Sequence, residues 1–332
     1  FAIDKVSDIT VATQDKYCAP VSGVSLIQNG TKKIGTAPDV LLYSKAFTTD
    51  SSGLSSRSNL EWDTYSFAVT SALHHLAGYT PLLPLTIAPS STTMLSLFIE
   101  SAASSSLLVG VKNASGTPIA DVQVQIDKTG VSTSTLTGRN VHRETDWSNG
   151  RYAAQDGNID DATPAGSLTI KKSGGLYATS TNSFLESSTI DFGTATTAFH
   201  RLSWAPLSQP SNTSLKFQLA SASASTGPWS YLGPDGTGST YYTSTSSISS
   251  AINGGRYVRY KIFMNTTSDA QTPQLDEVSI VFSSGCVPSG HAFFAGIPTG
   301  SYDITASKSG YQTATTTITV GSGWQEASLI MQ

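Results

Sequence analysis

Two stretches far apart in the chain carry one pattern: Leu60-Glu-Trp-Asp-Thr-Tyr65-Ser-Phe-Ala-Val69 and Ile297-Pro-Thr-Gly-Ser-Tyr302-Asp-Ile-Thr-Ala306. Each is typical of a strand that begins at a tyrosine and leads to a Gly-Tyr turn, a strand of alternating pattern and a Ser/Gly-rich turn. The continuations are Ala77-Gly-Tyr79-Thr with Leu85-Thr-Ile-Ala-Pro-Ser-Ser, and Ser309-Gly-Tyr311-Gln with Ile318-Thr-Val-Gly-Ser-Gly. Because order and spacing match, the sequence predicts two copies of one β module.

The front halves of the two modules also correspond, as strand, Asn/Gly turn and strand, in residues 21–30 and 107–126. In the second copy, front and back are separated by everything from about Gly130 to Ser284. We therefore expect a whole domain to be inserted there. The predicted organisation is residues 1–17 as an N-terminal segment, 18–102 as the first sandwich, 103–130 with 285–332 as the second, and 131–284 as the insert.

The composition is that of exposed antiparallel sheets. Ser and Thr make up 94 of the 332 residues, while charged residues reach only 13%, against about 25% in typical soluble domains. Hydroxyl side chains can cover the outer face of a sheet without the charge density of intracellular proteins. The fold class predicted is all-β and multidomain, and the location predicted is extracellular, at a cell surface.

Charge and hydropathy exclude two kinds of partner. The net charge is −4, and no basic cluster is longer than a Lys-Lys pair, so we expect no nucleic acid. No apolar run approaches the roughly 18–20 residues that cross a bilayer.

The first residues lack the plan of a signal peptide, so we expect a mature, processed chain, from which an N-terminal membrane or pilin helix could have been removed.

The module segments Gly116-Thr-Pro-Ile-Ala-Asp-Val-Gln-Val and Phe293-Phe-Ala-Gly-Ile-Pro-Thr-Gly-Ser-Tyr resemble the carboxypeptidase regulatory-like, or transthyretin-like, sandwich of bacterial surface proteins. The resemblance covers roughly half the chain. It implies two Ig/transthyretin-like β-sandwiches that act as spacer, stalk or adhesion modules and contribute no catalytic residues.

Two further resemblances are shorter. In the insert, Gly255-Arg-Tyr-Val-Arg-Tyr260 and the apolar strand after it look like the end of a discoidin-type jelly roll, which implies a sandwich similar to carbohydrate-binding modules. The segments Leu60-Glu-Trp-Asp-Thr-Tyr, Thr145-Asp-Trp-Ser and Gln155-Asp-Gly-Asn-Ile-Asp resemble those of pilin-like surface proteins, which implies a filament subunit.

Cys18 and Cys286 are the only cysteines. An even number in a chain of secreted composition permits one disulfide, which would staple two domains together. Two separate thiols are an equal alternative, because geometry decides whether cysteines pair.

The best local motif for a metal is Asp156-Gly-Asn158-Ile-Asp160-Asp161. Its alternating oxygen side chains have the spacing of a loop that folds around Ca²⁺, which takes six to eight oxygen ligands. The alternative is an Asx-rich turn whose side chains cap their own backbone.

A Gly/Ser/Thr-rich stretch of the insert carries four aromatic residues, Trp229, Tyr231, Tyr241 and Tyr242. Exposed aromatics on sandwich loops could stack on a surface glycan, and the alternative is packing in the core or at an edge.

The first 17 residues contain Ile9 and Val11 in alternation with polar residues, a strand without a local partner. It could pair within its own domain or complete the sheet of a neighbouring copy by strand addition. A helix is a competing interpretation, because apolar residues also fall at helical spacing.

No residue pattern supports catalysis. Glu61 and Asp63 lie on one strand at i and i+2 and would not straddle a scissile bond, and the histidines at 142, 200 and 291 are scattered singly. We therefore predict a non-enzymatic filament, pilus or stalk subunit that forms a homopolymer. The alternative is an adhesin or carbohydrate-binding module acting through the insert.

Overall fold

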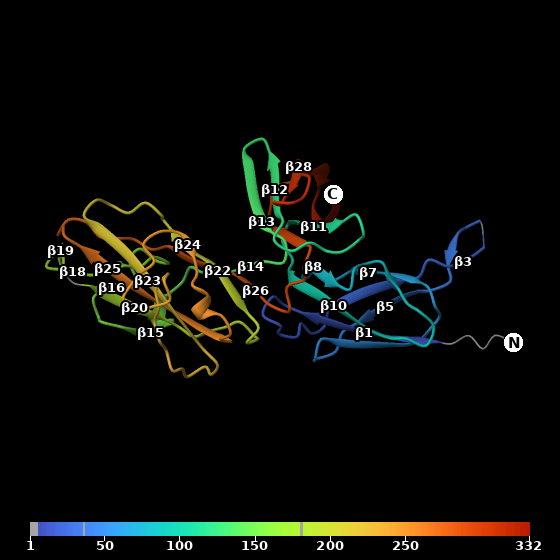
Figure 1. Ribbon diagram of the computed structural model, residues 1–332, viewed down its shortest axis with the longest axis horizontal. Coiled ribbons are helices and arrows are strands. Elements are labelled where there is room, and N and C mark those ends of the chain that lie inside the picture. Colours follow the sequence, from blue (N-terminus) through green and yellow to red (C-terminus); the bar gives the residue numbers. More distant parts are fainter. Residues whose placement is uncertain (1–5, 36, 180–181) are drawn as a thin grey trace. The chain divides into compact units, whose positions relative to one another are not determined.

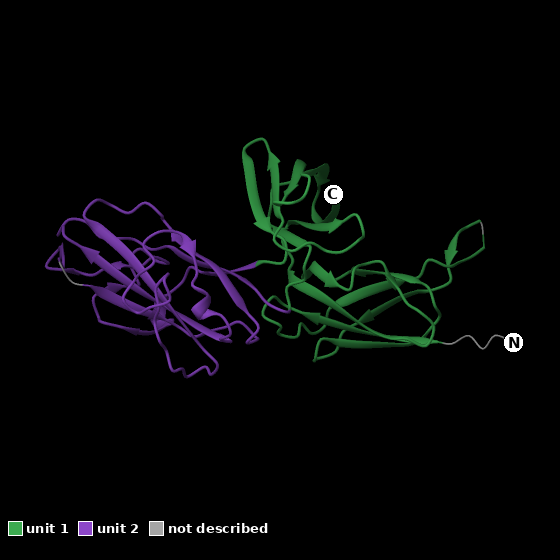
Figure 2. Ribbon diagram, in the orientation of Figure 1, with its two compact units in different colours: residues 1–139, 286–332 green, residues 140–285 purple. Residues whose placement is uncertain are grey.

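The structure is a computed structural model that describes residues 6–35, 37–179 and 182–332. Its regular elements are strands, joined by turns that include the short 3-10 segments η1 (Ser148–Gly150) and η2 (Ser250–Ile252). The chain divides into two compact units, residues 1–139 with 286–332, and residues 140–285 (Figure 2). The predicted all-β, multidomain class is confirmed. None of the helices described is long and apolar enough to cross a membrane.

The first unit begins with a sandwich of two four-stranded sheets, in the orders β6-β1-β10-β8 and β5-β2-β7-β9 (Figure 1). Its buried residues, among them Ile9, Leu26, Tyr65 and Leu97, form one hydrophobic core. Strands β3 and β4 form a separate hairpin. The bounds are β1 (Ser7–Gln14), β2 (Ser25–Asn29), β3 (Lys33–Ile34), β4 (Val40–Leu41), β5 (Ser44–Thr48), β6 (Leu54–Leu60), β7 (Thr64–Val69), β8 (His74–Thr80), β9 (Leu85–Thr86) and β10 (Thr92–Ser101).

A second sandwich completes the first unit, with sheets β27-β11-β30 and β13-β12-β28-β29. Its core is built around Val109, Ile126, Tyr302 and Leu329. The bounds are β11 (Ser105–Asn113), β12 (Gln123–Lys128), β13 (Val131–Leu136), β27 (His291–Ala295), β28 (Gly300–Ser307), β29 (Ala314–Val320) and β30 (Gly323–Met331).

The two sandwiches share one topology. In each, the first strand runs parallel to the last, β1 with β10 and β11 with β30. In each, the first strand also pairs antiparallel on its other side, with β6 or β27. The second strand lies between two antiparallel neighbours, β5 and β7 or β13 and β28. Among the described strands of the first sandwich, the hairpin β3–β4 and strand β8 have no counterpart in the second.

This topology corrects three expectations. The first sandwich begins at β1, not at residue 18, because β1 is the counterpart of β11. The insert begins at residue 140 and not 131, because β13 pairs along its whole length with β12. The two Gly-Tyr pairs are not equivalent, since Tyr79 is buried in the extra strand β8 and Tyr311 is exposed in a turn.

The insertion point is a single turn. The amide of Val24 donates to Thr49 Oγ1, and Val122 donates to Thr137 Oγ1 in the same way. On the other side of the turn lie Gly53 and Gly290. Their carbonyl oxygens accept backbone hydrogen bonds from the first strand of their sandwich. Residues 50–52 span this gap in the first sandwich, and residues 138–289 span it in the second.

Both glycines are required where they stand. Gly53 and Gly290 have φ angles of 70° and 77°, a left-handed conformation that favours glycine. A Cβ at Gly290 would lie 2.6 Å from the Cβ of Pro118, and one at Gly53 would lie 3.3 Å from that of Pro20. The turn therefore has the same backbone constraint with and without a guest domain.

The second unit is a sandwich of sheet β14-β26-β22-β24 against a sheet in which β25 pairs with β20, β21 and β23. Trp147, Phe192, Phe217, Tyr260 and Phe282 lie in its interior. The bounds are β14 (Asn140–Glu144), β15 (Tyr152–Gln155), β16 (Ile159–Asp160), β17 (Thr169–Ile170), β18 (Lys172–Ser173), β19 (Leu176–Tyr177), β20 (Ser183–Ser187), β21 (Ile190–Asp191), β22 (Ala198–Ala205), β23 (Thr213–Ala222), β24 (Ser246–Ser247), β25 (Tyr257–Thr266) and β26 (Glu277–Ser283).

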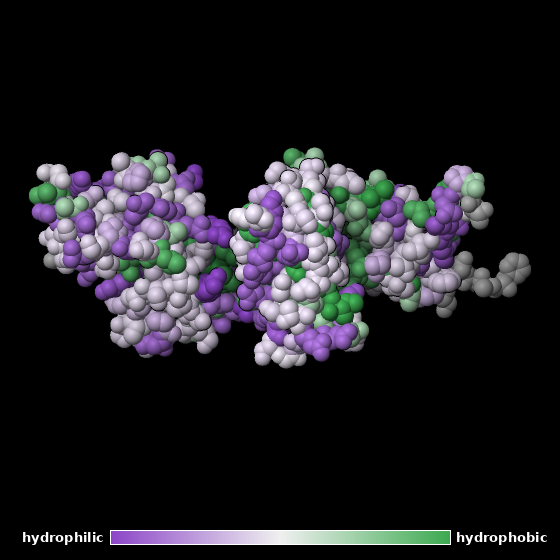
Figure 3. Space-filling view, turned by 90° about the horizontal axis from the view of Figure 1, so that it is seen from above, coloured by the Kyte–Doolittle hydropathy of each residue, from purple (hydrophilic) through white to green (hydrophobic). Residues whose placement is uncertain are grey.

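The surface reflects the composition. In the face shown in Figure 3, most residues are pale, the colour of intermediate hydropathy, and hydrophobic residues appear only in scattered patches. In strands β13 and β29 the exposed positions are serines and threonines, as the sequence indicated.

Candidate functional site

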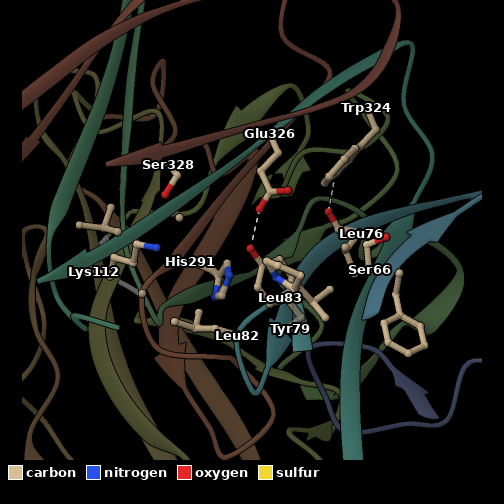
Figure 4. A pocket seen from close by; sticks show the side chains of 15 residues that line it. Ser66, Leu76, Tyr79, Leu82, Leu83, Lys112, His291, Trp324, Glu326 and Ser328 are labelled. Atoms are coloured by element: carbon tan, nitrogen blue, oxygen red, sulfur yellow. Dashed lines mark hydrogen bonds between the residues drawn. The ribbon is translucent and has the colours of Figure 1, made fainter. Parts of the chain in front are cut away.

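The junction of the two sandwiches in the first unit is the most elaborate site of the described chain. Leu108 and Phe293, which belong to strands of the second sandwich, pack into the hydrophobic core of the first. Trp324 Nε1 donates to the Leu76 carbonyl at 2.6 Å, and the Tyr79 hydroxyl donates to Glu326 Oε1 at 2.6 Å (Figure 4). The extra strand β8 therefore joins the two sandwiches.

Gly78 also belongs to this junction. A Cβ at this position would lie 2.5 Å from Cγ of Pro288, in the segment that leads from the second unit into β27. Glycine here allows β8 and that segment to approach closely.

A pocket of about 390 Å³ opens beside these contacts. Leu82 and Leu83 line one wall, while Lys112, Glu326 and Ser328 come from strands of the second sandwich (Figure 4). His291 lies between these walls. Sequence reasoning missed this site, because its residues come from distant segments and form no local motif.

His291 is the buried titratable group of the junction. Its Nδ1 donates to the Ser289 carbonyl at 3.2 Å, and its ring meets that of Tyr79 edge-on at 4.3 Å between centroids. Its Nε2 is buried without a partner among the described residues. Burial lowers the pKa of His291 to about 4, with the hydrogen bond to Ser289 opposing, so this histidine is neutral at pH 7.

Glu326 is the second group of the pocket whose pKa is shifted. Desolvation raises the pKa of its carboxyl above the usual value, and the hydrogen bond from Tyr79 opposes this shift. Desolvation also raises the pKa of Tyr79, so this phenol stays a hydrogen-bond donor. The pocket is therefore lined by three groups, His291, Glu326 and Tyr79, that burial drives toward their neutral forms.

A disulfide between Cys18 and Cys286, with Cα atoms 5.4 Å apart, anchors the same region. Cys18 lies in the turn between β1 and β2, and Cys286 is the first residue after the second unit. The bond thus ties the segment that returns from the inserted unit to the first sandwich. The alternative of two free thiols is wrong in this structure.

The sequence-predicted strand Ile9 to Val11 is not a free assembly strand. Both residues are fully buried, and β1 lies between β6 and β10 in its own sheet. The helical interpretation is wrong. The strand pairs within its own domain and is not added to the sheet of a neighbouring copy, because its side chains form part of the core of the first sandwich.

The predicted calcium loop uses its oxygens on its own backbone. Asp156 Oδ1 accepts from the amide of Asn158 at 2.9 Å, and Asp160 Oδ1 accepts from the amides of Ala162 and Thr163. Over residues 6–35, 37–179 and 182–332, no three His, Cys, Asp or Glu side chains gather as a metal site. Calcium binding that involves Asp161 and its neighbours stays a prediction.

Three of the four predicted glycan-contact residues gather over one face of β25, opposite its buried side chains. The Arg259 guanidinium lies 4.6 Å from the Trp229 ring centre, and Lys261 Nζ lies 5.5 Å from that of Tyr231. Tyr241 meets the Phe263 ring edge-on at 5.2 Å.

Tyr242 is a correction. It is 1% exposed, and its hydroxyl accepts from the Ser249 amide, so it is a core residue and is not accessible to a glycan.

Asp63, which the sequence analysis rejected as a catalytic residue, stabilises a turn. Its carboxylate accepts from the amides of Thr31, Lys32 and Thr64. Burial alone would raise the pKa of Asp63, but these hydrogen bonds and that of the Thr31 hydroxyl lower it. Glu61 instead points to Lys32 at 3.3 Å, so the two carboxylates do not act together.

No model of a known protein family matches the chain, and no curated protein matches its sequence. Among solved structures it is similar to a streptococcal ancillary pilin at 12% identity over 55% of this chain, with a TM-score of 0.22. The chain spans 59% of the length of that pilin.

Two further pilins match over most of the chain. A minor pilin of Streptococcus agalactiae is 10% identical over 98% of this chain and 96% of its own, with a TM-score of 0.22. The major pilin subunit of Bacillus cereus is 10% identical over 96% and 69%, with a TM-score of 0.25. These structures are pilins to which the chain is similar, and TM-scores this low assign it to no family.

Proposed function

We propose that the chain is a load-bearing structural subunit of an extracellular filament, pilus or stalk. The observation that carries the proposal is the parallel pairing of the first and last strands in both sandwiches. Strands β1 and β10 align over seven residue pairs, and β11 and β30 over nine.

Parallel end strands resist tension along the chain. A pull on the start of β1 and the end of β10 drives the two strands past each other, so that all their ladder hydrogen bonds are loaded together. Antiparallel neighbours pulled from one end would open one bond at a time. Because β10 leads directly into β11, tension that crosses the β1–β10 ladder passes from the first sandwich to the second. The disulfide of Cys18 with Cys286 adds a covalent path in parallel with this ladder.

The inserted unit lies off this path. It enters after β13 and leaves before β27, inside the second sandwich, so tension between β11 and β30 does not pass through it while that sandwich is folded. The disulfide of Cys18 with Cys286 also supports an extracellular role, since disulfides persist in oxidising compartments.

Single-molecule pulling tests this proposal. The whole chain held beyond β1 and β30 should unfold at higher force than the same chain held at Gln123 and Leu136, which face each other across an antiparallel pair. Equal forces in the two geometries would refute the load-bearing role. Electron microscopy of the purified chain and of the producing cell should show fibres.

The second candidate is an adhesin that binds a glycan through the inserted unit. The cluster of Trp229, Tyr231 and Tyr241 beside Arg259 and Lys261 favours it, because aromatic faces stack on sugar rings and cationic side chains donate hydrogen bonds. Glycan-array binding that is lost in Tyr241→Ala and kept in Tyr311→Ala, an exposed tyrosine of the first unit, would support this function.

A further inference from the structure

The two sandwiches differ at one sheet edge. In the first, β8 pairs antiparallel with β10 along Ser96 to Ser101. In the second, β28 is followed directly by a short turn and β29. Across the described ranges, β30 pairs with β11 alone and no strand occupies its other edge.

Equivalent residues of the two last strands also differ in exposure. Gln14 and Lys112 are equivalent, because each forms an isolated bridge to the proline six residues later. Their partners on the last strands are Phe98 and Ile330. Phe98 is 4% exposed, whereas Ile330 is 54% exposed. The second sandwich therefore presents an apolar side chain where the first buries one.

The edge of β30 also lacks the features that keep edge strands apart. It is nine residues long, its register with β11 is unbroken, and it contains no Lys, Arg or Pro. By contrast, the edge strands β5 and β6 carry Lys45 and Arg57. Long and regular edges without Lys, Arg or Pro are those that pair with another chain.

We propose that β30 pairs antiparallel with β30 of a second copy of this chain, so that the three-stranded sheets of two copies join across a two-fold axis. The antiparallel sense is that of β8 on β10. A contact of an edge with itself is isologous and closes a dimer. We choose a second copy as the partner because two β30 strands can pair without strong charge repulsion. The one ionisable residue of the strand, Glu326, is hydrogen-bonded to Tyr79, and Ser328 and Ile330 beside it are neutral.

The geometry of the junction leaves this edge accessible. The sheet order is β27-β11-β30, and β8 of the first sandwich contacts β27 and β11. It meets β30 through the side chains of Trp324 and Glu326, which project from the face of the sheet and not from its edge. The pairing names one contact surface and does not depend on filament formation.

A positive charge introduced on the β30 edge tests the proposed pairing. In sedimentation equilibrium of the whole chain, the wild type should dimerise, and Ile330→Lys should raise the dimer dissociation constant at least tenfold. Leu207→Lys, at a 63% exposed apolar residue in a loop of the inserted unit, should leave it unchanged. Equal urea midpoints would show that both variants fold.

A second readout reports the contact itself. The chain has no free cysteine among its described residues, so Ser328→Cys should crosslink two copies under mild oxidation and Leu207→Cys should not. A monomeric wild type, or dimers unchanged by Ile330→Lys, would overturn the pairing.

Discussion

At the scale of single residues, the repeat is clearest in two tyrosines. The Tyr65 hydroxyl donates to the carbonyl of Glu61, and that of Tyr302 donates to the carbonyl of Pro298, each four residues earlier. Both rings are buried at the start of equivalent strands. Each tyrosine thus fixes the corner that leads into β7 or β28.

Removal of one hydroxyl tests this role. Tyr302→Phe should lower the stability of the second sandwich by about 0.5–1.5 kcal/mol, because the Pro298 carbonyl loses its hydrogen-bond donor. Hydrogen exchange of β28 amides would measure the loss. Tyr311→Phe, in an exposed turn, is the control, and an equal effect of the two variants would contradict the assignment.

The buried His291 predicts an acid-sensitive junction. Its pKa of about 4 in the folded chain lies below its usual value of about 6.5, so between these values the unfolded state binds more protons. Stability should therefore be full above pH 6.5 and fall as the pH decreases toward 4, by at most about 1.4 kcal/mol per pH unit.

The measurement compares urea unfolding of the wild type and His291→Gln at pH 7 and pH 5. The comparison isolates His291, since Glu326, whose pKa is raised, acts in the opposite sense in both proteins. A wild type that loses no more stability than the variant would contradict this prediction.

Residue roles were only partly predictable from the sequence. The cysteine count permitted a disulfide, but Tyr241 and Tyr242 have the same side chain in the same loop, and only the fold decides which one is buried. The roles of Asp63 and His291 depend on partners from other strands, such as Thr31 and Tyr79. No local pattern announces such partners.

At the scale of elements, β1 is an internal strand of the first sandwich. Ile9→Ala should destabilise that sandwich by about 2–5 kcal/mol, because it leaves a cavity in a fully buried site. Val6→Ala, at a half-exposed residue just before β1, should change stability by no more than about 0.5 kcal/mol. Thermal unfolding would measure both, and a neutral Ile9→Ala would show that β1 is dispensable.

The sequence predicted strands well and their partners less well. Alternation in Tyr257 to Ile262 matches the observed burial of β25. The insert boundary was placed too early because the Ser/Thr pattern of β13 resembles a linker, and only its pairing with β12 assigns it to the second sandwich. The extra strand β8 was hidden because both Gly-Tyr pairs have the same local sequence.

At the scale of the whole molecule, the disulfide joins Cys18 and Cys286, which are 268 positions apart in the sequence. Replacing both Cys18 and Cys286 with serine should lower the stability of the first unit by about 2–5 kcal/mol, because the unfolded chain regains conformational freedom. Calorimetry should show a lower Tm for this unit and an unchanged transition for residues 140–285. A shift of both transitions would mean that the bond stabilises more than the first unit.

The domain plan was the most predictable feature at this scale. A repeat interrupted by a long unmatched stretch indicates an insertion, and the structure places the guest within a turn that spans three residues in the sister sandwich. The junction was not predictable, because β8, the segment after Cys286 and the start of β30 meet only in the folded chain.

The position of the guest in that turn has an evolutionary consequence. A domain inserted in one turn can diversify in sequence without a change in the β1–β10 and β11–β30 ladders, which we propose bear tension. Selection can therefore alter the surface of the inserted unit while it conserves these ladders. Variation among natural forms of the chain should concentrate in residues 140–285.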